Sequence, residues 1–485
     1  MDAQKVILIL ADNQQAATLG VYGNHEARTP HLDALAGDGM TFTHAFCANA
    51  YCSPCRASVL TGLMPSGHGV HSWIDDRTPE DWPHDWHALR GLDTLPERLR
   101  AAGYATGIFG KYHLGVTDTV GPGWDQWCVM ADGHVRSFND NAITENGYRL
   151  DRSGHAVEIF TDRALAWLSG DGPRFAYVPF PAPYGHWPAT RDTRNLPTLA
   201  DFSDCPLNTV PRLGLSPEAV AHYDRIKDQS GGGLDFSMLL SAPNDVATLR
   251  NYYAQISLID RAVGRMRAAH PDAVIIYCAD HGLSLGHHGF WGHGGATYPS
   301  NLHRAAHSVP LIAAGPGVVR GQSDDMVGTT DLYATLLDIC GAGGAGERPS
   351  RSLWPRLTGT APPLGAFDTV ISEQEETRVL RTKDWVFFRR FRALGSPDLP
   401  DALYDLRSDP DETVNLAADP AQAERVADFC GQIDDFFARH ARAEFDLWRG
   451  GCAVQNSMIP EFWRDVWGPG WGPVYHRTDA PRPAP

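Results

Sequence analysis

The residues best suited to chemistry stand just after two short apolar runs. Asp12 and Asn13 follow the run VILIL, and Asp280 and His281 come soon after the run AVIIY. Open α/β sheets bind ligands at the carboxyl ends of their strands, so these four side chains converge if the two strands are neighbours. Carboxylate and amide oxygens suit a hard divalent cation, and one imidazole extends the choice to Mn²⁺ or Zn²⁺. The alternative is two ordinary polar strand ends that cap helices.

A second cluster, CSPCR at residues 52–56, combines two thiols, a proline and an arginine. Cys52 and Cys55 have the spacing of a redox pair or of half a zinc site, but no second CxxC completes a four-cysteine cage. Pro54 suits the first turn of a helix, which places Cys52 at the positive end, where thiolates and anions are stabilised. Arg56 adds a planar donor fork for an oxyanion. A buried cysteine in front of a capped helix explains the same pattern equally well.

Taken together, the motifs resemble the type I sulfatases, a family of the alkaline phosphatase superfamily. In that family the cysteine of a CxPxR signature is oxidised to formylglycine after translation, and residues 52–62 (CSPCRASVLTG) are similar to that signature. Other segments resemble further landmarks of the family in the expected order: ILADN at 9–13, GKYHLG at 110–115, APYGHWP at 182–188, ADHG at 279–282 and LYDLRSDPDE at 403–412.

The resemblance implies both a mechanism and the residues that carry it. A hydrated formylglycine at position 52, assisted by one divalent metal, would attack the sulfur of a sulfate ester, expel the alcohol and release sulfate as the aldehyde re-forms. Ca²⁺ is the implied metal, with Mn²⁺ or Zn²⁺ as alternatives. Its implied ligands are Asp12, Asn13, Cys52, Asp280 and His281. The implied catalytic residues are Cys52, Arg56, Lys111, His113, His186 and His293.

Individual roles follow from the same resemblance. Arg56 would hold the oxygen of the nucleophile, and His113 would act as the base that breaks down the hemiacetal. Lys111 and the two remaining histidines would bind the sulfate oxygens, and His186 or His293 would protonate the leaving alcohol. A formylglycine-generating enzyme is the implied partner that modifies Cys52.

The sequence departs from the family around the expected substrate pocket. Asn13 replaces the second aspartate of the common pair, Cys55 stands where a small residue is usual, and His293 stands where many members have lysine. We therefore expect hydrolysis of a small-molecule sulfate monoester, with a phosphonate monoester or phosphodiester hydrolase of the same machinery as the main alternative. A catalytically silent binding protein of this fold is disfavoured, because the motif residues are retained together. A CxxC oxidoreductase is disfavoured too, because no thioredoxin-like unit surrounds Cys52.

Composition narrows the class of protein. The chain has 485 residues, of which 43% are hydrophobic and 20% charged, so it can bury a large core. With 58 acidic and 41 basic residues the net charge is −17, which disfavours nucleic acid as a partner. We see no apolar run near the roughly 20 residues of a membrane span and no signal peptide. Nine cysteines, an odd number, suggest reduced thiols, and a cytoplasmic location is expected.

The elements that must position these residues alternate between apolar strands and amphipathic helices. This alternation predicts an α/β fold whose large, mostly parallel central sheet is sandwiched by helices, and the resemblance implies an alkaline-phosphatase-like arrangement. We expect a catalytic domain over residues 1–365. A smaller α+β subdomain with an antiparallel sheet and one helix is expected over residues 366–445. Residues 446–485 are predicted to form a C-terminal arm or tail, and such an arm makes a homodimer or homotetramer plausible.

Overall fold

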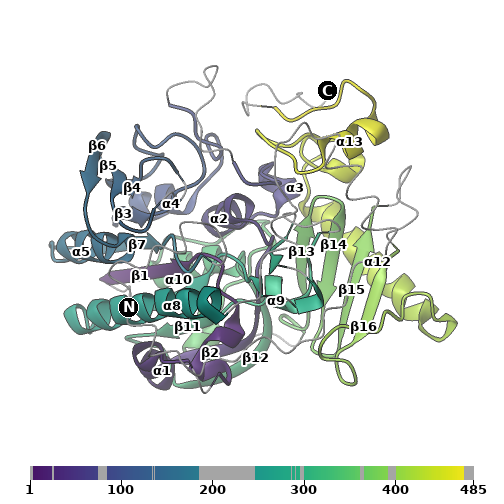
Figure 1. The fold of residues 1–485 in the computed structure, drawn as a ribbon, viewed down its shortest axis with the longest axis horizontal. Helices are drawn as coiled ribbons and strands as arrows, with labels where there is room; N and C mark the ends of the chain where they lie inside the picture. Colours follow the sequence, from purple (N-terminus) through teal and green to yellow (C-terminus); the bar gives the residue numbers. More distant parts are fainter. Residues whose placement is uncertain are drawn as a thin grey trace.

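The structure is a computed structural model, and it describes residues 4–24, 27–74, 85–133, 135, 137–184, 246–285, 287–289, 291–294, 300–360, 365–391 and 400–474. Two sheets dominate these residues, one large and central and the other small and C-terminal (Figure 1). Within this part of the chain, no helix combines the length and hydrophobicity that crossing a bilayer requires.

The central sheet has ten strands in the order β12-β2-β11-β8-β1-β7-β3-β4-β5-β6. Its strands are β1 (Lys5–Ala11), β2 (Met40–Phe46), β3 (Ala105–Gly110), β4 (Gln126–Met130), β5 (Asn141–Glu145), β6 (Tyr148–Arg152), β7 (Arg174–Pro179), β8 (Val274–Ala279), β11 (Leu311–Ala314) and β12 (Gly321–Gly328). The middle of the sheet, from β8 through β1, β7 and β3 to β4, is parallel. These strands are buried on both faces, which is why they are continuous apolar runs in the sequence.

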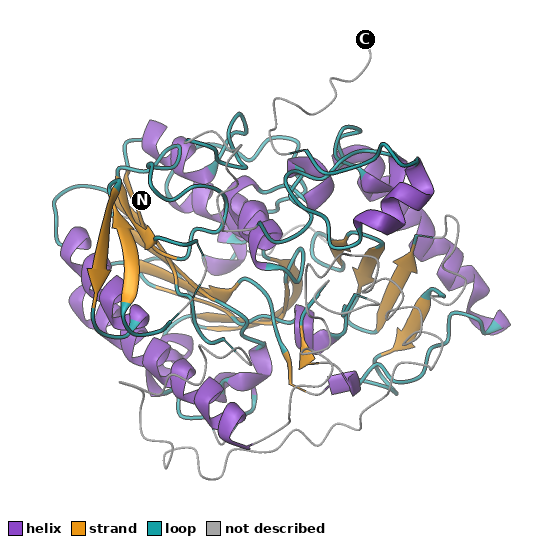
Figure 2. Ribbon diagram, turned by 45° about the horizontal axis from the view of Figure 1, so that its top comes forward, coloured by secondary structure: helices purple, strands orange, loops and turns teal. Residues whose placement is uncertain are grey.

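Helices cover both faces of this sheet (Figure 2). One contiguous group is α1 (Pro30–Gly37), α5 (Ala156–Leu168) and α8 (Val246–Ala269). The other is α2 (Cys52–Thr61), α4 (Leu95–Ala101) and α10 (Asp331–Ile339). Three shorter helices lie between or directly after these elements in the chain: α3 (Pro65–His68), α9 (Arg304–His307) and α11 (Trp354–Leu357). Strands β9 (Ser284–Leu285) and β10 (Trp291–Gly292) form a separate two-stranded sheet.

The second sheet is antiparallel, in the order β13-β14-β15-β16. Its strands are β13 (Val370–Gln374), β14 (Thr377–Arg381), β15 (Trp385–Arg390) and β16 (Ala402–Asp405). Helix α12 (Ala423–His440) packs against it through Phe429, Ile433 and Phe437, which recur every four residues and so share one face of the helix. A buried ion pair between Arg381 and Glu412, 2.6 Å apart, stabilises this part of the chain.

The segment after α12 packs closely onto the rest of the chain. It contains α13 (Pro460–Trp467), and its buried side chains form one cluster with Tyr51, the residue before α2: Leu447, Ala453, Met458, Ile459, Phe462 and Trp463. We call residues 446–474 the C-terminal segment and these six side chains with Tyr51 the segment cluster. Figure 1 shows α13 at the top of the view.

The expected α/β class, with a separate antiparallel sheet, is confirmed. The central sheet is mixed, because β11, β5 and β6 join it antiparallel to their neighbours. Residues 378–391 hold two strands joined by a turn at 382–384, since Trp385 donates its backbone N–H back to Thr382. The domain boundary near residue 365 remains a prediction.

Candidate active site

The metal motifs meet because β1 and β8 are parallel neighbours in register. Ala11 pairs with Ala279, so the residues that follow each strand leave the sheet at the same point. The backbone N–H of Asp280 donates to the carbonyl of Ala11 (2.9 Å), and that of Asn13 donates to Asp280 Oδ1 (3.1 Å). Asn13 has a φ of 65°, a left-handed conformation that asparagine tolerates better than most residues.

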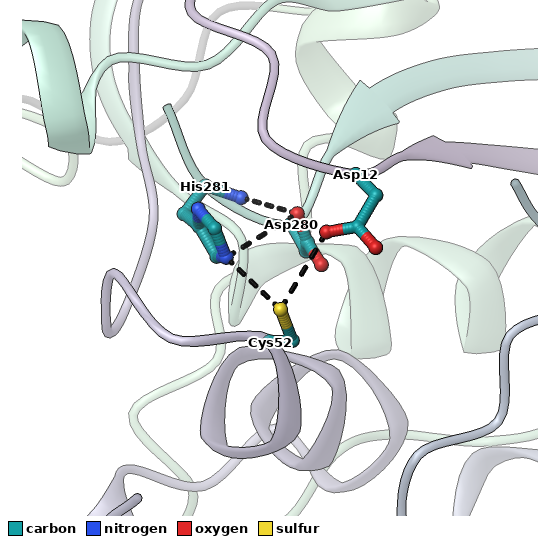
Figure 3. A group of neighbouring side chains, drawn as sticks. All are labelled: Asp12, Cys52, Asp280 and His281. Carbon is teal, nitrogen blue, oxygen red and sulfur yellow. Dashed lines mark hydrogen bonds and ion pairs between the residues drawn. The ribbon is translucent and has the colours of Figure 1, made fainter. Parts of the chain in front are cut away.

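Helix α2 presents Cys52 to this strand end from its first turn. Cys52 Sγ lies 3.5 Å from Asp12 Oδ1 and 3.3 Å from His281 Nε2 (Figure 3). All three residues are buried, at 2%, 0% and 0% exposed. Burial is the main cause that raises the pKa of the Cys52 thiol, so the unmodified side chain is a neutral thiol and not a thiolate.

Two buried cations neutralise the two carboxylates. Lys111 Nζ lies 2.6 Å from Asp12 Oδ2, and Arg56 Nη2 lies 2.7 Å from Asp280 Oδ2 and 3.6 Å from Asp12 Oδ2. Burial opposes the charge on each cation, but the facing aspartates outweigh it and raise the pKa of both Arg56 and Lys111. The other carboxylate oxygen of Asp12, Oδ1, faces Cys52 (Figure 3).

The hydrogen bonds of two histidines indicate which ring nitrogens face the site. His281 Nδ1 lies 2.8 Å from the carbonyl of Gly282, an acceptor only, so Nδ1 carries the proton and the Nε2 lone pair faces Cys52. His293 Nδ1 lies 2.7 Å from the carbonyl of Ala50 in the same way. The two rings are 4.1 Å apart, so His293 lies directly against this cluster.

The side chains present fit a divalent cation. One ligand atom from each of Asp12, Cys52, Asp280 and His281 lies within 4.8 Å of the others. Asn13 Oδ1 is also buried and accepts no hydrogen bond from any residue within the described ranges, as expected of an atom available to bind a cation. Carboxylate and amide oxygens with one imidazole suit Ca²⁺, Mn²⁺ or Zn²⁺.

The GKYHLG segment begins at the last residue of β3 and brings Lys111 to Asp12. β3 ends at Gly110, where a side chain is impossible because a Cβ would lie 2.0 Å from the carbonyl of Pro179. This close approach directs Lys111 to Asp12. His113 is 2% exposed and has a φ of 56°. His186, the remaining predicted catalytic residue, lies outside the described residues.

Cys55 has a different environment from Cys52. Its Sγ donates to the carbonyl of Asp280 (2.6 Å) and lies 3.4 Å from Thr329 Oγ1. Both cysteines are free thiols. Cys55 therefore packs α2 against the end of β8. The CxxC spacing of the sequence does not predict this contact.

Two aromatic side chains beside the site have no role assigned from the sequence. Tyr184 places its ring 5.4 Å from Lys111 Nζ, and Trp73 places its ring 6.3 Å from that of His113. Tyr184 lies inside a recognised segment but has no assigned role in it, and Trp73 lies in none of the motifs. Only the long-range packing of the chain brings them here.

Comparison with known proteins identifies the class. Residues 4–342 match the family described as Sulfatase. The chain therefore belongs to the sulfatase family and is, by class, a sulfuric ester hydrolase.

Individual relatives agree with this assignment. The chain is 24% identical to the N-acetylglucosamine-6-O-sulfatase of Bacteroides thetaiotaomicron, over 85% of this chain and 82% of that protein. It is 27% identical to human N-sulphoglucosamine sulphohydrolase, over 92% and 91%. The crystal structure of the phosphonate monoester hydrolase of Agrobacterium radiobacter shares the fold, with a TM-score of 0.66 and 21% identity over 91% of this chain and 96% of that one.

Proposed function

We propose that this enzyme hydrolyses sulfate monoesters with a formylglycine made from Cys52 and with one divalent metal. The observation that carries the proposal is the position of Cys52 Sγ, in the first turn of a buried helix and between Asp12 Oδ1 and His281 Nε2 (3.5 and 3.3 Å). A residue converted at this position would carry its oxygens to the same place.

Asp12, Asn13, Asp280 and His281 would hold the metal, with Ca²⁺ as the first candidate. The bound cation would withdraw electron density from the reacting oxygens and favour their attack on sulfur. The formylglycine, as its hydrate, would supply one hydroxyl as nucleophile and a second whose deprotonation releases sulfate. A serine or an unmodified cysteine lacks that second hydroxyl.

Charged residues and histidines of the chain would bind the sulfate oxygens and transfer the protons. Arg56 and Lys111 stay charged in the buried site, so both can hold oxygens of the nucleophile and of the sulfate group. Because His293 Nδ1 donates a hydrogen bond to the carbonyl of Ala50, Nε2 is the atom through which the protonated ring of His293 would give a proton to the leaving oxygen. We assign the base of the second stage to His113, and His186 remains a second candidate for the acid.

A phosphonate monoester or phosphodiester hydrolase is the second candidate. Both kinds of ester present one negative charge, as a sulfate monoester does, so the same two cations suit them. The shared fold with a phosphonate monoester hydrolase makes a direct comparison necessary.

We also propose that a formylglycine-generating enzyme modifies Cys52, that the enzyme is cytoplasmic and that it assembles as a homodimer or homotetramer. Size-exclusion chromatography with light scattering measures the last of these, and a monomer at micromolar concentration would contradict it.

The first test is the mass of the tryptic peptide covering residues 29–56, from protein produced with its modifying enzyme. We expect the mass deficit of a thiol converted to an aldehyde, and none in the matched Cys52→Ala variant. Modified protein is then assayed side by side on 4-nitrophenyl sulfate and 4-nitrophenyl phenylphosphonate, where a higher kcat/KM for the sulfate supports the proposal. An unmodified thiol in protein from the native host, or a preference for the phosphonate, would overturn it.

A further inference from the structure

We propose that Trp73 forms the wall of the pocket that receives the leaving group, and that the C-terminal segment holds it in place. The proposal rests on the proposed function of the same site. It adds a substrate class: esters whose alcohol is a ring, aromatic or sugar, and not a short aliphatic chain.

The backbone around Trp73 is tied to the helix of the nucleophile. The N–H of Ile74 donates to Ser53 Oγ at 2.9 Å, and Ser53 directly follows Cys52. Ile74 and Ser53 are both buried, at 1% and 0% exposed. The position of Trp73 is therefore fixed relative to the first turn of α2.

The indole faces the catalytic loop that follows β3. Its ring lies 6.3 Å from that of His113 and is inclined to it by 39°. Trp73 is only partly buried, so part of its surface stays open. An aromatic face at this place offers a ring of the substrate a flat apolar contact.

The indole N–H of Trp73 is buried and donates to none of the residues that the structure describes. This N–H is the sole hydrogen-bonding group of an indole, which is a donor and has no acceptor. A buried donor without a partner is costly, and buried tryptophan N–H groups usually find one. A hydroxyl or ether oxygen on the leaving group would satisfy it.

The C-terminal segment also contacts Trp73. Asn456 Nδ2 donates to the backbone carbonyl of Trp73 (3.2 Å), and the ring packs against the segment cluster. Tyr51 belongs to this cluster and lies with its ring 5.2 Å from His293. The cluster thus includes the residue that precedes the nucleophile's helix and also contacts Trp73.

A buried carboxylate anchors the segment. Glu375, at the end of β13, accepts hydrogen bonds from Ser457 Oγ (2.6 Å), the N–H of Met458 (2.6 Å) and Trp463 Nε1 (3.0 Å). Its own backbone carbonyl accepts one from Trp448 Nε1 (2.8 Å). These contacts fix the segment against the antiparallel sheet, so the wall is rigid before substrate arrives.

The test compares two leaving groups in two variants of Trp73 and one control variant. Trp73→Leu removes the ring, Trp73→Phe removes the N–H and keeps an aromatic face, and Trp354→Leu removes a partly buried tryptophan in α11 as the matched control. With 4-nitrophenyl sulfate, Trp73→Leu should lower kcat/KM roughly 10- to 100-fold, Trp73→Phe less, and the control hardly at all. With ethyl sulfate, all variants should stay within about threefold of the parent enzyme.

Equal losses on both substrates, or none on the aryl ester, would overturn the proposal. Binding of 4-nitrophenyl sulfate to the full-length Cys52→Ala protein, with and without Trp73→Leu, is measured by calorimetry in parallel. We expect the affinity to fall by a similar factor, and an unchanged affinity refutes the wall. Since this measurement needs no turnover, a parent enzyme that hydrolyses no sulfate would refute the proposed function separately.

Discussion

Lys111 offers a sharp test of how the site balances its charge. Its ammonium lies 2.6 Å from Asp12 Oδ2, and both side chains are fully buried. At an effective dielectric constant of 20 the attraction between these charges is about 6 kcal/mol. Breaking a buried pair by removing one partner costs about 3–5 kcal/mol, because it leaves the other charge uncompensated. Arg56 lies 3.6 Å from the same oxygen and compensates in part. We therefore expect Lys111→Met to cost about 3 kcal/mol of unfolding free energy in metal-free protein.

A bound cation should reverse part of this loss. Removal of one positive charge next to Asp12 makes the donor set more negative, so Ca²⁺ should bind the variant more tightly. A tenfold gain in affinity corresponds to about 1.4 kcal/mol, by which saturating Ca²⁺ would reduce the loss. The measurement is urea denaturation of parent and variant, in EDTA and in Ca²⁺, with a calorimetric Ca²⁺ titration.

A matched control comes from a surface ion pair. Lys383 and Asp324 are 2.5 Å apart, but their side chains are 45% and 70% exposed. Lys383→Met should therefore cost less than about 0.5 kcal/mol in either buffer. A loss below about 1 kcal/mol for Lys111→Met in EDTA, or an identical loss with and without Ca²⁺, would refute the argument that Lys111 and the cation compete for the charge of Asp12.

Two further predictions concern groups that support the site. A Cβ at Gly294 (φ 44°) would lie 2.4 Å from the carbonyl oxygen of Ala50, which accepts a hydrogen bond from His293. Gly294→Ala should therefore displace His293 and lower kcat about 10-fold or more, while one Ca²⁺ per chain still binds. A kcat equal to that of the parent enzyme would contradict this. Burial raises the pKa of Glu375 to about 7, so folding stability should fall by up to about 3 kcal/mol between pH 4.5 and 7 as the unfolded chain ionises first. Urea denaturation across this range should show the decrease in the parent enzyme and lose it in Glu375→Gln, and parallel pH profiles would contradict the assignment.

Much of the fold follows from the local sequence. The apolar run of β1 is a local strand signal, and Thr94, Pro96 and Glu97 are a local helix start signal that the structure shows as a capping box at the start of α4. Such signals are local, because apolar periodicity and caps depend on neighbouring residues. The turn at 382–384 is local as well, since three polar residues separate β14 from β15.

For the candidate site too, the residue types follow from the sequence and their positions do not. The sequence alone determined the residue types: an ordered set of motifs singled out Cys52, Asp12 and Asp280 and indicated the chemistry they suit. It could not place them, because their separation in space depends on β1 and β8 being parallel neighbours in register, a pairing between strands more than 250 residues apart.

The tertiary structure alone decided what surrounds these residues. It gives Cys55 a packing contact with Asp280, brings the C-terminal segment against Tyr51 and Trp73, and sets Trp73 beside His113. None of these contacts follows a spacing rule, since each joins side chains from different elements whose positions are fixed by how apolar faces pack. The sequence thus determined the residue types available to this protein, and the packing of its two sheets decided which side chains lie together at the candidate site.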